Sequence, residues 1–417
     1  MKLVKIIAGI CLGLISSKGF AQLKLDAEVR PRFENRHGFK SLFPDNADAA
    51  AFVSQRTRLN TYYNSEKLIL KISVQDIRTW GDVPTLNTTD NFGSSLHEAW
   101  GEILLNDKLS LKLGRQEISL DDQRIMGAVN WAQQARSHDA AIIKYKNNQF
   151  TAQLAIAHNQ NGEQLIGNTY NVPKNYKSMQ YVWLHKNWQD FSASFLFLNN
   201  GLQYIDADEV NNETRYSQTL GLHLNYKKDK MKYNSNLYYQ MGKDIGDNEI
   251  KAYLASLNIN YKNSEKWNAS IGGEIISGND DAIIKDGENT AFAPLYGTNH
   301  KFNGLMDYFY VGNHANNVGL VDTYINTTLK VNESSKLHMA FHNFAAAAEL
   351  SASTSNQLGN EIDIVYSYRF DKDVIFKAGY SQLFPSEGME ILKNNFDENN
   401  NYFAWLMVVI KPNLLTF

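Results

Sequence analysis

The chain has 417 residues, a formal net charge of −3 and charged side chains at 20% of its positions. Its one cysteine, Cys11, lies in a segment that we expect to be cleaved off, so the mature chain should have no disulfide, thiolate metal site or cysteine nucleophile. No run of about 18 apolar residues follows that segment, which excludes membrane-spanning helices. No glycine-rich phosphate loop or nucleic-acid-binding motif stands out, so we expect neither a cofactor nor a nucleic-acid partner.

Residues 1–21 have the pattern of a secretory signal peptide. Two lysines precede an apolar run over residues 6–15, and small residues lead to a cleavage position after Ala21. We therefore expect the mature protein to begin near Gln22 and to be exported.

Apolar and polar residues alternate along most of the remaining chain, which predicts β-strands with one apolar face. We count about 18 such segments, of roughly ten residues each, as in outer-membrane barrels. An even number of strands brings both chain ends to the same, periplasmic, edge. The segments begin near residues 23, 52, 68, 96, 109, 139, 150, 178, 191, 215, 231, 250, 266, 319, 336, 358, 374 and 400.

The connections between these segments alternate in length. Short turns such as 147–148 and 227–230 join strands on one side. Short periplasmic turns and long extracellular loops are typical of outer-membrane barrels, so we assign the longer connections to the outside of the cell. The long connections are 37–51, 80–95, 120–138, 160–177, 279–318 and 386–399.

We therefore predict an all-β fold: a single antiparallel transmembrane β-barrel over residues 22–417, in the bacterial outer membrane. Aromatic residues make up 12% of the chain, and Tyr and Trp suit the two interfacial girdles of a barrel. The last strand ends on Phe417, and Leu415 keeps the alternation while Asn413 and Lys411 break it. A soluble β-sandwich or β-propeller is the alternative, but we find no blade repeat of about 40–50 residues.

Short polar and aromatic motifs are concentrated in the first third of the chain. Gly-Arg-Gln at 114–116 is followed by Asp-Gln-Arg at 122–124, and this pairing is the more specific part of the pattern. The other motifs are Gln-Arg-Thr-Arg-Leu at 55–59, Asp-Ile-Arg-Thr-Trp-Gly at 76–81, Leu-His-Glu-Ala-Trp-Gly-Glu-Ile at 96–103, Asn-Trp at 130–131, Arg-Ser-His-Asp-Ala at 136–140 and Tyr-Gly-Thr-Asn-His-Lys-Phe-Asn-Gly at 296–304.

Together these motifs resemble the core signature of the alginate-export family of outer-membrane barrels. The resemblance is dense over residues 27–145 and returns near 291–312, and elsewhere only the strand pattern is shared. It implies a barrel of about 18 strands that passes an anionic polysaccharide through an arginine-lined pore. It also implies periplasmic export partners.

Arginine is unevenly distributed, because nine of the eleven arginines lie before residue 140. Those on the first two strands share the polar parity, which must face the lumen, since a charge facing lipid costs about 2–4 kcal/mol at the bilayer midplane. By the same alternation, Lys71 and Lys112 should face the lumen and their apolar sequence neighbours the lipid. The candidate pore-lining residues are Arg30, Arg32, Arg56, Arg58, Arg78, Lys71, Lys112, Arg115, Arg124 and Arg136, with Glu98, Asn130 and Trp131 beside them.

Two interpretations of this arginine patch are open. A planar guanidinium binds carboxylates through two hydrogen bonds, so a ring of arginines favours anions over cations. Alternatively, acids on the same strands, among them Glu28, Glu34 and Glu98, neutralise the arginines in an internal ion-pair lattice. The excess of basic residues over these acids favours a lattice that also sets anion selectivity.

Two long connections could act on the pore. The segment 120–138 is expected to fold towards the lumen, where Asn130 and Trp131 could contact a sugar; alternatively, Trp131 anchors the barrel at the membrane interface. The loop 279–318 either covers the pore mouth as a lid or plug, or packs against the rim. Its aromatic residues are Tyr296, Phe302, Tyr308, Phe309 and Tyr310.

Few residues favour an enzyme or a metal site. Ser137, His138 and Asp139 have the composition of a catalytic triad, but neighbours on a strand point to opposite faces. Acidic loop tips such as Asp280 and Asp281 could hold Ca²⁺ or bridge lipopolysaccharide, although solvated loop charge is the simpler explanation.

The predicted function is an anion-selective outer-membrane channel that passes anionic saccharides or small anionic solutes. We expect outer-membrane lipid and lipopolysaccharide around it. A barrel enzyme acting on lipid and a closed structural or adhesive barrel are the alternatives.

Overall fold

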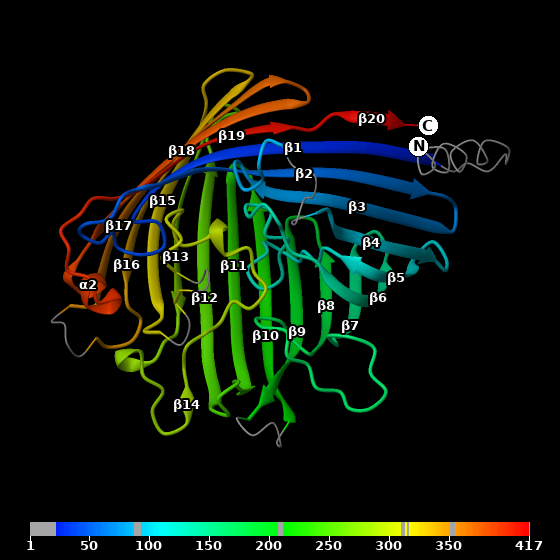
Figure 1. Ribbon diagram of the computed structural model, residues 1–417, viewed down its shortest axis with the longest axis horizontal. Coiled ribbons are helices and arrows are strands. Elements are labelled where there is room, and N and C mark those ends of the chain that lie inside the picture. Colours follow the sequence, from blue (N-terminus) through cyan, green and yellow to red (C-terminus); the bar gives the residue numbers. More distant parts are fainter. Residues whose placement is uncertain are drawn as a thin grey trace.

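The computed structural model describes residues 22–86, 93–206, 212–309, 313–314, 317–350 and 355–416. The predicted signal peptide and Phe417 lie outside these residues. Within them, 18 strands form one closed antiparallel barrel, in which each strand pairs with the next and β19 pairs with β1 (Figure 1). The predicted barrel is therefore confirmed.

The strands begin within three residues of the predicted positions, and the largest difference is at β10. The first nine are β1 (Gln22–His37), β2 (Ala50–Asn64), β3 (Leu68–Thr79), β4 (Ser95–Leu104), β5 (Leu109–Gln116), β6 (His138–Lys146), β7 (Phe150–His158), β8 (Ser178–Asn187) and β9 (Phe191–Ile205). The second nine are β10 (Asn212–Lys228), β11 (Met231–Lys243), β12 (Glu249–Lys262), β13 (Trp267–Ile276), β15 (Leu320–Lys330), β16 (Ser335–Ala345), β17 (Gln357–Asp371), β18 (Val374–Pro385) and β19 (Asn401–Ile410).

Two short additional strands pair with strands of the barrel wall. β14 (Glu288–Asn289) pairs in parallel with the start of β12. β20 (Asn413–Thr416) pairs with β1 and continues the course of β19 after a break at Lys411 and Pro412. Proline has no N–H, but its carbonyl still accepts a hydrogen bond from Ala27 N (3.2 Å). This break explains why the alternation fails near the end of the chain.

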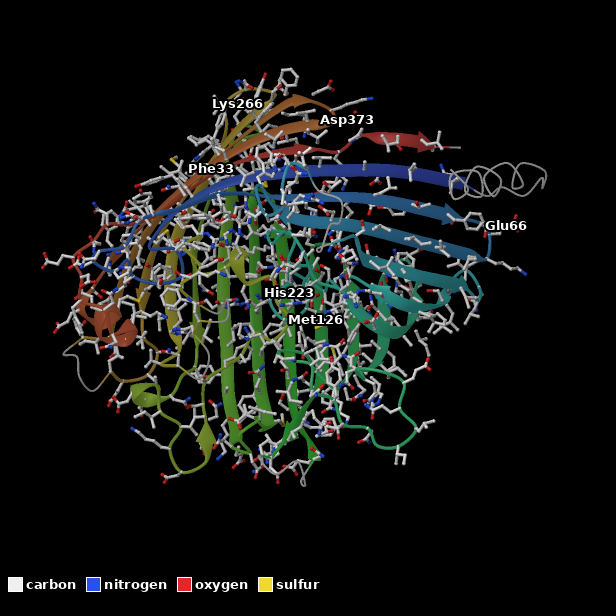
Figure 2. The ribbon with its side chains drawn as sticks, viewed as in Figure 1. Phe33, Glu66, Met126, His223, Lys266 and Asp373 are labelled. Atoms are coloured by element: carbon white, nitrogen blue, oxygen red, sulfur yellow. The ribbon has the colours of Figure 1, made fainter. Side chains whose placement is uncertain are left out.

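Short turns and long loops lie at opposite rims, as predicted. Figure 1 shows β20 and the turn between β2 and β3 at the upper right, and β14 and the helix α2 (Glu387–Lys393) at the lower left. Figure 2 labels Glu66, Lys266 and Asp373, which mark three of the short turns. The rim with the short turns also holds the first described residue and β20, so both described chain ends lie there.

The wall has one apolar and one polar face. Leu59, Ile72 and Leu113 are 45%, 41% and 42% exposed on the outside, where lipid would cover them. Their polar neighbours Ser73 and Lys112 are buried on the inside. The predicted orientations of these strands are confirmed, because a shift of one residue would exchange the two faces.

Aromatic side chains form pairs along the rim with the short turns. Each pair joins neighbouring strands where they enter a hairpin, and most of these rings are exposed. Such a belt is typical of the membrane–water interface. The pairs are Tyr145–Phe150, Trp188–Phe191, Tyr226–Tyr233, Tyr261–Trp267 and Phe370–Phe376.

The apolar core is built mainly where two long connections enter the barrel. We call residues 117–137 the inner loop and the described part of residues 277–319 the cap loop. Ile125 and Met126 of the inner loop and Met306 and Tyr308 of the cap loop are almost completely buried. Figure 2 shows Met126 inside the barrel, near His223 of β10 in that view.

Helical structure among the described residues is limited to short segments. The cap loop contains two 3-10 turns, η1 (Asp280–Ala282) and η2 (Asn299–Lys301). The helix α2 ends at Lys393, and the left-handed conformation of the next residue, Asn394, closes its last turn. In this part of the chain, no helix has both the length and the apolar character needed to cross a membrane.

Candidate functional site

Arginines of β1 bind one side of the inner loop. The Arg30 guanidinium donates to the Asn130 carbonyl (2.7 Å) and to Gln133 Oε1 (3.0 Å from Nε). Arg32 donates to the Trp131 carbonyl (2.6 Å). Both arginines are buried. Because a guanidinium has five N–H donors, one side chain can hold several loop oxygens.

Arginines of β2 continue this contact. Arg56 forms a buried ion pair with Glu28 and also donates to a carbonyl of the inner loop (3.3 Å). Arg58 donates to Gln75 Oε1 (2.7 Å), and Gln75 donates to the Gln134 carbonyl (3.1 Å). These arginines therefore form a lattice with the loop, and much of that lattice consists of bonds to neutral oxygens.

The opposite side of the inner loop is bound to β8, β11 and β13. The Asp121 carboxylate accepts from Trp183 Nε1 (3.0 Å), and burial raises the pKa of Asp121. Asp122 accepts from an asparagine of β11 (2.7 Å). Arg124 is fully buried and forms an ion pair with Glu274 of β13, with Nε 3.0 Å from Oε2. The inner loop therefore crosses the lumen, and the predicted inward fold is observed.

The inner loop and the cap loop are joined through their backbones. Met126 and Tyr296 form a parallel β-bridge, and Gly127 N donates to the Tyr296 carbonyl (2.9 Å). Gly127 lies so close to Thr298 that a Cβ atom would fall 2.2 Å from its hydroxyl oxygen. Arg136 donates to another cap-loop carbonyl (3.3 Å). The two loops therefore act as one insertion.

Trp131 lies between the two loops and the wall. Its ring is 4.0 Å from the Arg32 guanidinium, 4.1 Å from the stacked His300 ring and 5.0 Å from the Trp405 ring of β19. The interface-anchor interpretation is therefore wrong, because the side chain is inside the barrel. Protein groups already contact this ring on several sides. Contact of Trp131 with a sugar stays a prediction.

Aromatic residues of the cap loop pack against the extracellular rim. The buried Tyr308 hydroxyl donates to the Gly38 carbonyl (2.5 Å) in the loop after β1. Burial raises the pKa of Tyr308. Phe309 packs on Phe344 of β16, with 4.7 Å between ring centroids. Tyr310 lies outside the described residues. Rim packing is therefore the observed arrangement of Tyr308 and Phe309.

A row of polar side chains lines the lumen on β3, β4 and β5. Lys71 forms an ion pair with Glu98, which also accepts from Trp100 Nε1 (2.9 Å). Lys112 lies over the Trp100 ring at 3.7 Å. The structure thus places three predicted pore-lining residues, Lys71, Lys112 and Glu98, on the inner face, as expected.

A cavity of about 340 Å³, which we call the basic cavity, opens beside the arginine lattice. It lies against β1–β3, β18 and β19, and Asn130 of the inner loop also lines it. Its only lining carboxylates among the described residues are Glu28 and Glu117. The lining cations are Arg30, Arg56, Arg58, Lys71, Lys377 and Lys411.

Lys377 and Lys411 were not among the predicted site residues. They come from the end of the chain, and closure of the barrel places β18 and β19 next to β1. Lys377 could have been found, because it has the opposite parity to the exposed Phe376. Lys411 lies at the break before β20, where alternation gives no signal.

A larger cavity, of about 800 Å³, lies against β11–β13 and β15–β17, and we call it the acid–amide cavity. Asparagines from three of these strands and from the cap loop line it, with His338 and His342 of β16. Lys301 lines it too; burial lowers its pKa, and it donates to the Asp122 carbonyl (2.7 Å). The lining carboxylates are Asp122, Glu274, Asp322 and Asp363.

Two predicted pore residues, Arg78 and Arg115, lie on the outer face instead. Arg78 has the parity of the exposed Ile72 and pairs with Asp76 on the same strand (2.6 Å). Arg115 has the parity of Leu113 and pairs across strands with Asp139 (2.8 Å). Both lie at the extracellular ends of their strands, where the cost of a charge facing lipid falls to about 0–1 kcal/mol. The expectation that all these arginines form one inner patch was therefore wrong.

Ser137 approaches a histidine that is distant in sequence rather than its neighbour. Its hydroxyl is 3.1 Å from His97 Nδ1, and His97 Nε2 is 2.9 Å from Glu117 Oε1. Ligand atoms of His97, Glu98 and Glu117 lie within 4.8 Å of one another, but Lys71 pairs with Glu98 and disfavours a metal ion there. Sequence order gave no signal for this arrangement.

Comparisons with known proteins agree with the barrel. No curated protein sequence matches the chain. Its fold is similar to that of OccAB4 from Acinetobacter baumannii (12% identity, TM-score 0.64), with 96% of this chain and 99% of that chain covered. It is also similar to OpdQ from Pseudomonas aeruginosa (12% identity, TM-score 0.61, coverage 94% and 98%) and to the outer membrane protein OpdK from the same species (9% identity, TM-score 0.62, coverage 95% and 99%).

Fold and lumen together define a bacterial outer-membrane β-barrel of the porin or channel type. The sequence pattern described as alginate export matches residues 21–403. The chain therefore belongs to the alginate export family, as its motifs predicted.

Proposed function

We propose that the protein is an anion-preferring outer-membrane channel in which the basic cavity sets the preference. The observation that carries this proposal is the charge of the cavity, where six cationic side chains face two carboxylates. Among the described residues, neither Lys377 nor Lys411 has an acid within 4.0 Å. A fixed cation in a pore lowers the barrier for anions and raises it for cations.

The bonds of the arginine lattice support this proposal. Loop carbonyls satisfy several donors of Arg30 and leave its charge in place, although Glu28 lies 3.9 Å away, whereas Arg32 is paired with Glu34 (2.7 Å). Two unit charges 4 Å apart interact by about 1 kcal/mol in water and about 4 kcal/mol near a protein surface. A single lysine without an acid partner is therefore enough to change the permeability ratio several-fold.

We infer that the transported solutes are anionic saccharides or related carboxylates. The planar fork of arginine matches a carboxylate, and the family to which the chain belongs is described as alginate export. The asparagines of the acid–amide cavity add donors and acceptors that suit hydroxyl groups.

The proposal is tested by inserting the purified protein into a planar bilayer under a KCl gradient. We expect conductance steps and a reversal potential that indicates chloride passing more readily than potassium. High salt should reduce the difference by screening the fixed charges. Absence of conductance would instead favour a closed structural barrel, and a preference for potassium would overturn the proposed role of the basic cavity.

An esterase is a second candidate, which only the contacts of Ser137 favour. Ser137 would pass its proton to His97 and take the acyl group of an ester, releasing the alcohol, and water would then release the acid. His97 is only 3% exposed, so an ester would have to reach a closed site. Labelling of wild-type protein, but not of Ser137→Ala, by a fluorophosphonate would support this candidate, and equal or no labelling would exclude it.

A further inference from the structure

The acid–amide cavity has an unbalanced set of carboxylates. Glu274 pairs with Arg124, whereas Asp322 and Asp363 have only His342 as a charged partner within 4.0 Å among the described residues. His342 Nδ1 is 2.9 Å from Asp322, and its Nε2 is 3.9 Å from Asp363. One imidazole therefore serves two carboxylates.

A third acidic side chain lies beside these two. Glu361 lies on the same face of β17 as Asp363 and is fully buried. One of its oxygens accepts from Met306 N of the cap loop (2.8 Å), and the other has no hydrogen-bond partner. Gly304, which lines the cavity, lies directly against this carboxylate. A buried carboxyl group without a full set of hydrogen-bond partners favours a polar neighbour.

Lys232 and Lys301 also line the cavity, and Lys301 donates to the Asp122 carbonyl. Apart from these lysines and the histidines, the remaining lining is neutral and can form many hydrogen bonds. Asn234 and Asn236 of β11, Asn258 and Asn260 of β12 and Asn326 of β15 line the cavity. The Asn258 side-chain oxygen is buried without a partner. An amide offers two donors and one acceptor oxygen, which is the complement of a hydroxyl-rich molecule.

The size of the cavity argues for an organic ligand rather than a bare ion. Its volume of about 800 Å³ falls within the range of about 300–1,000 Å³ that is common for small-molecule sites. Asp322 and Asp363 lie on either side of a histidine instead of converging on one point. A metal ion needs converging ligands, whereas a ligand with one ammonium group and several hydroxyls can use a spread of acceptors.

We propose that the acid–amide cavity binds the amine-bearing, hydroxyl-rich part of a solute, such as a hexosamine unit, with its ammonium group against Asp322 and Asp363. Together with the basic cavity, this site favours saccharides that carry both an amine and a carboxylate. This second statement rests on the proposed channel function, but binding in the acid–amide cavity does not.

Isothermal titration calorimetry of the detergent-solubilised protein tests this site without requiring conductance. Glucosamine, which is cationic at neutral pH, should bind at least tenfold more tightly than N-acetylglucosamine, which has the same ring and no charge. Equal affinity for the two sugars, or no binding of either, would overturn the proposal. Because the comparison uses wild-type protein, a variant that fails to fold cannot obscure it.

Variants then locate the binding site. Asp322→Asn and Asp363→Asn keep the size of each side chain and remove its charge, and each should weaken glucosamine binding about fivefold or more. Asp139→Asn, on the outer face, is the matched control and should leave binding unchanged. If glucosamine binds with unchanged affinity to both cavity variants, the ammonium group lies elsewhere and the proposal is wrong.

Discussion

The basic cavity and the acid–amide cavity share one lumen, yet each keeps a charge of its own sign. Around the basic cavity, guanidiniums donate to carbonyls of the inner loop. Around the acid–amide cavity, carboxylates accept from amides and share one histidine, His342. Neutral partners satisfy the hydrogen bonds of a charged group without cancelling its charge. A charged side chain can therefore have all its hydrogen bonds satisfied by the barrel wall and still attract or repel an ion in the lumen.

The inserted loops lie where the two cavities meet. Trp131 contacts Arg32, which belongs to the lattice beside the basic cavity, and stacks on His300, which lines the acid–amide cavity. Arg124 ties the inner loop to the acidic wall through Glu274. Releasing the loops should therefore disturb both cavities at once.

The largest expected effect comes from Arg124→Ala. Breaking a buried ion pair leaves Glu274 charged and without its partner, which typically costs about 3–5 kcal/mol. We expect a lower unfolding temperature in detergent and larger, noisier conductance, because the inner loop loses its anchor on β13. Arg115→Ala breaks an exposed pair on the outer face and should cost no more than about 1 kcal/mol. Equal effects of the two variants would show that Arg124 does not anchor the loop.

The next largest effect should come from the basic cavity. Changing Lys377 and Lys411 to glutamate reverses two charges that have no acid partner, and the chloride-to-potassium permeability ratio should fall on the order of fivefold per charge in dilute salt. Reversal potentials measure this ratio. Arg115→Glu also reverses a charge but faces outward, so it should leave the ratio unchanged. A similar change in the control would mean that the field of the whole barrel, rather than the cavity, sets selectivity.

The smallest expected effect is a difference in labelling rate between the two faces of the strands. Both cavities depend on which side chains face the lumen. Single cysteines at Lys71 and Lys112 should react with a membrane-impermeant thiol reagent in proteoliposomes, because both positions face the lumen. Cysteines at Ile72 and Leu113 should react slowly, since lipid covers them. Reaction at the same rate for both pairs would contradict the strand registers.

The wall could be predicted from the sequence, because alternation in each strand reports a local choice between lipid and lumen. The signal weakens at the ends of strands, where Arg78 and Arg115 face outward at little cost. Alternation also does not predict contacts between residues that are distant in sequence, such as that of Ser137 with His97. Lys377 joins the basic cavity only because the last strands close against the first, which a reading in chain order does not show.

The central claim is that the two cavities act on ions with opposite sign, and one set of reversal potentials tests it. Wild-type protein, Lys377→Gln with Lys411→Gln, and Asp322→Asn with Asp363→Asn are compared under the same dilute KCl gradient. We predict that the wild type prefers chloride, that the lysine variant moves towards potassium and that the aspartate variant moves further towards chloride. Movement of both variants in the same direction, or no movement of the lysine variant, would contradict the account.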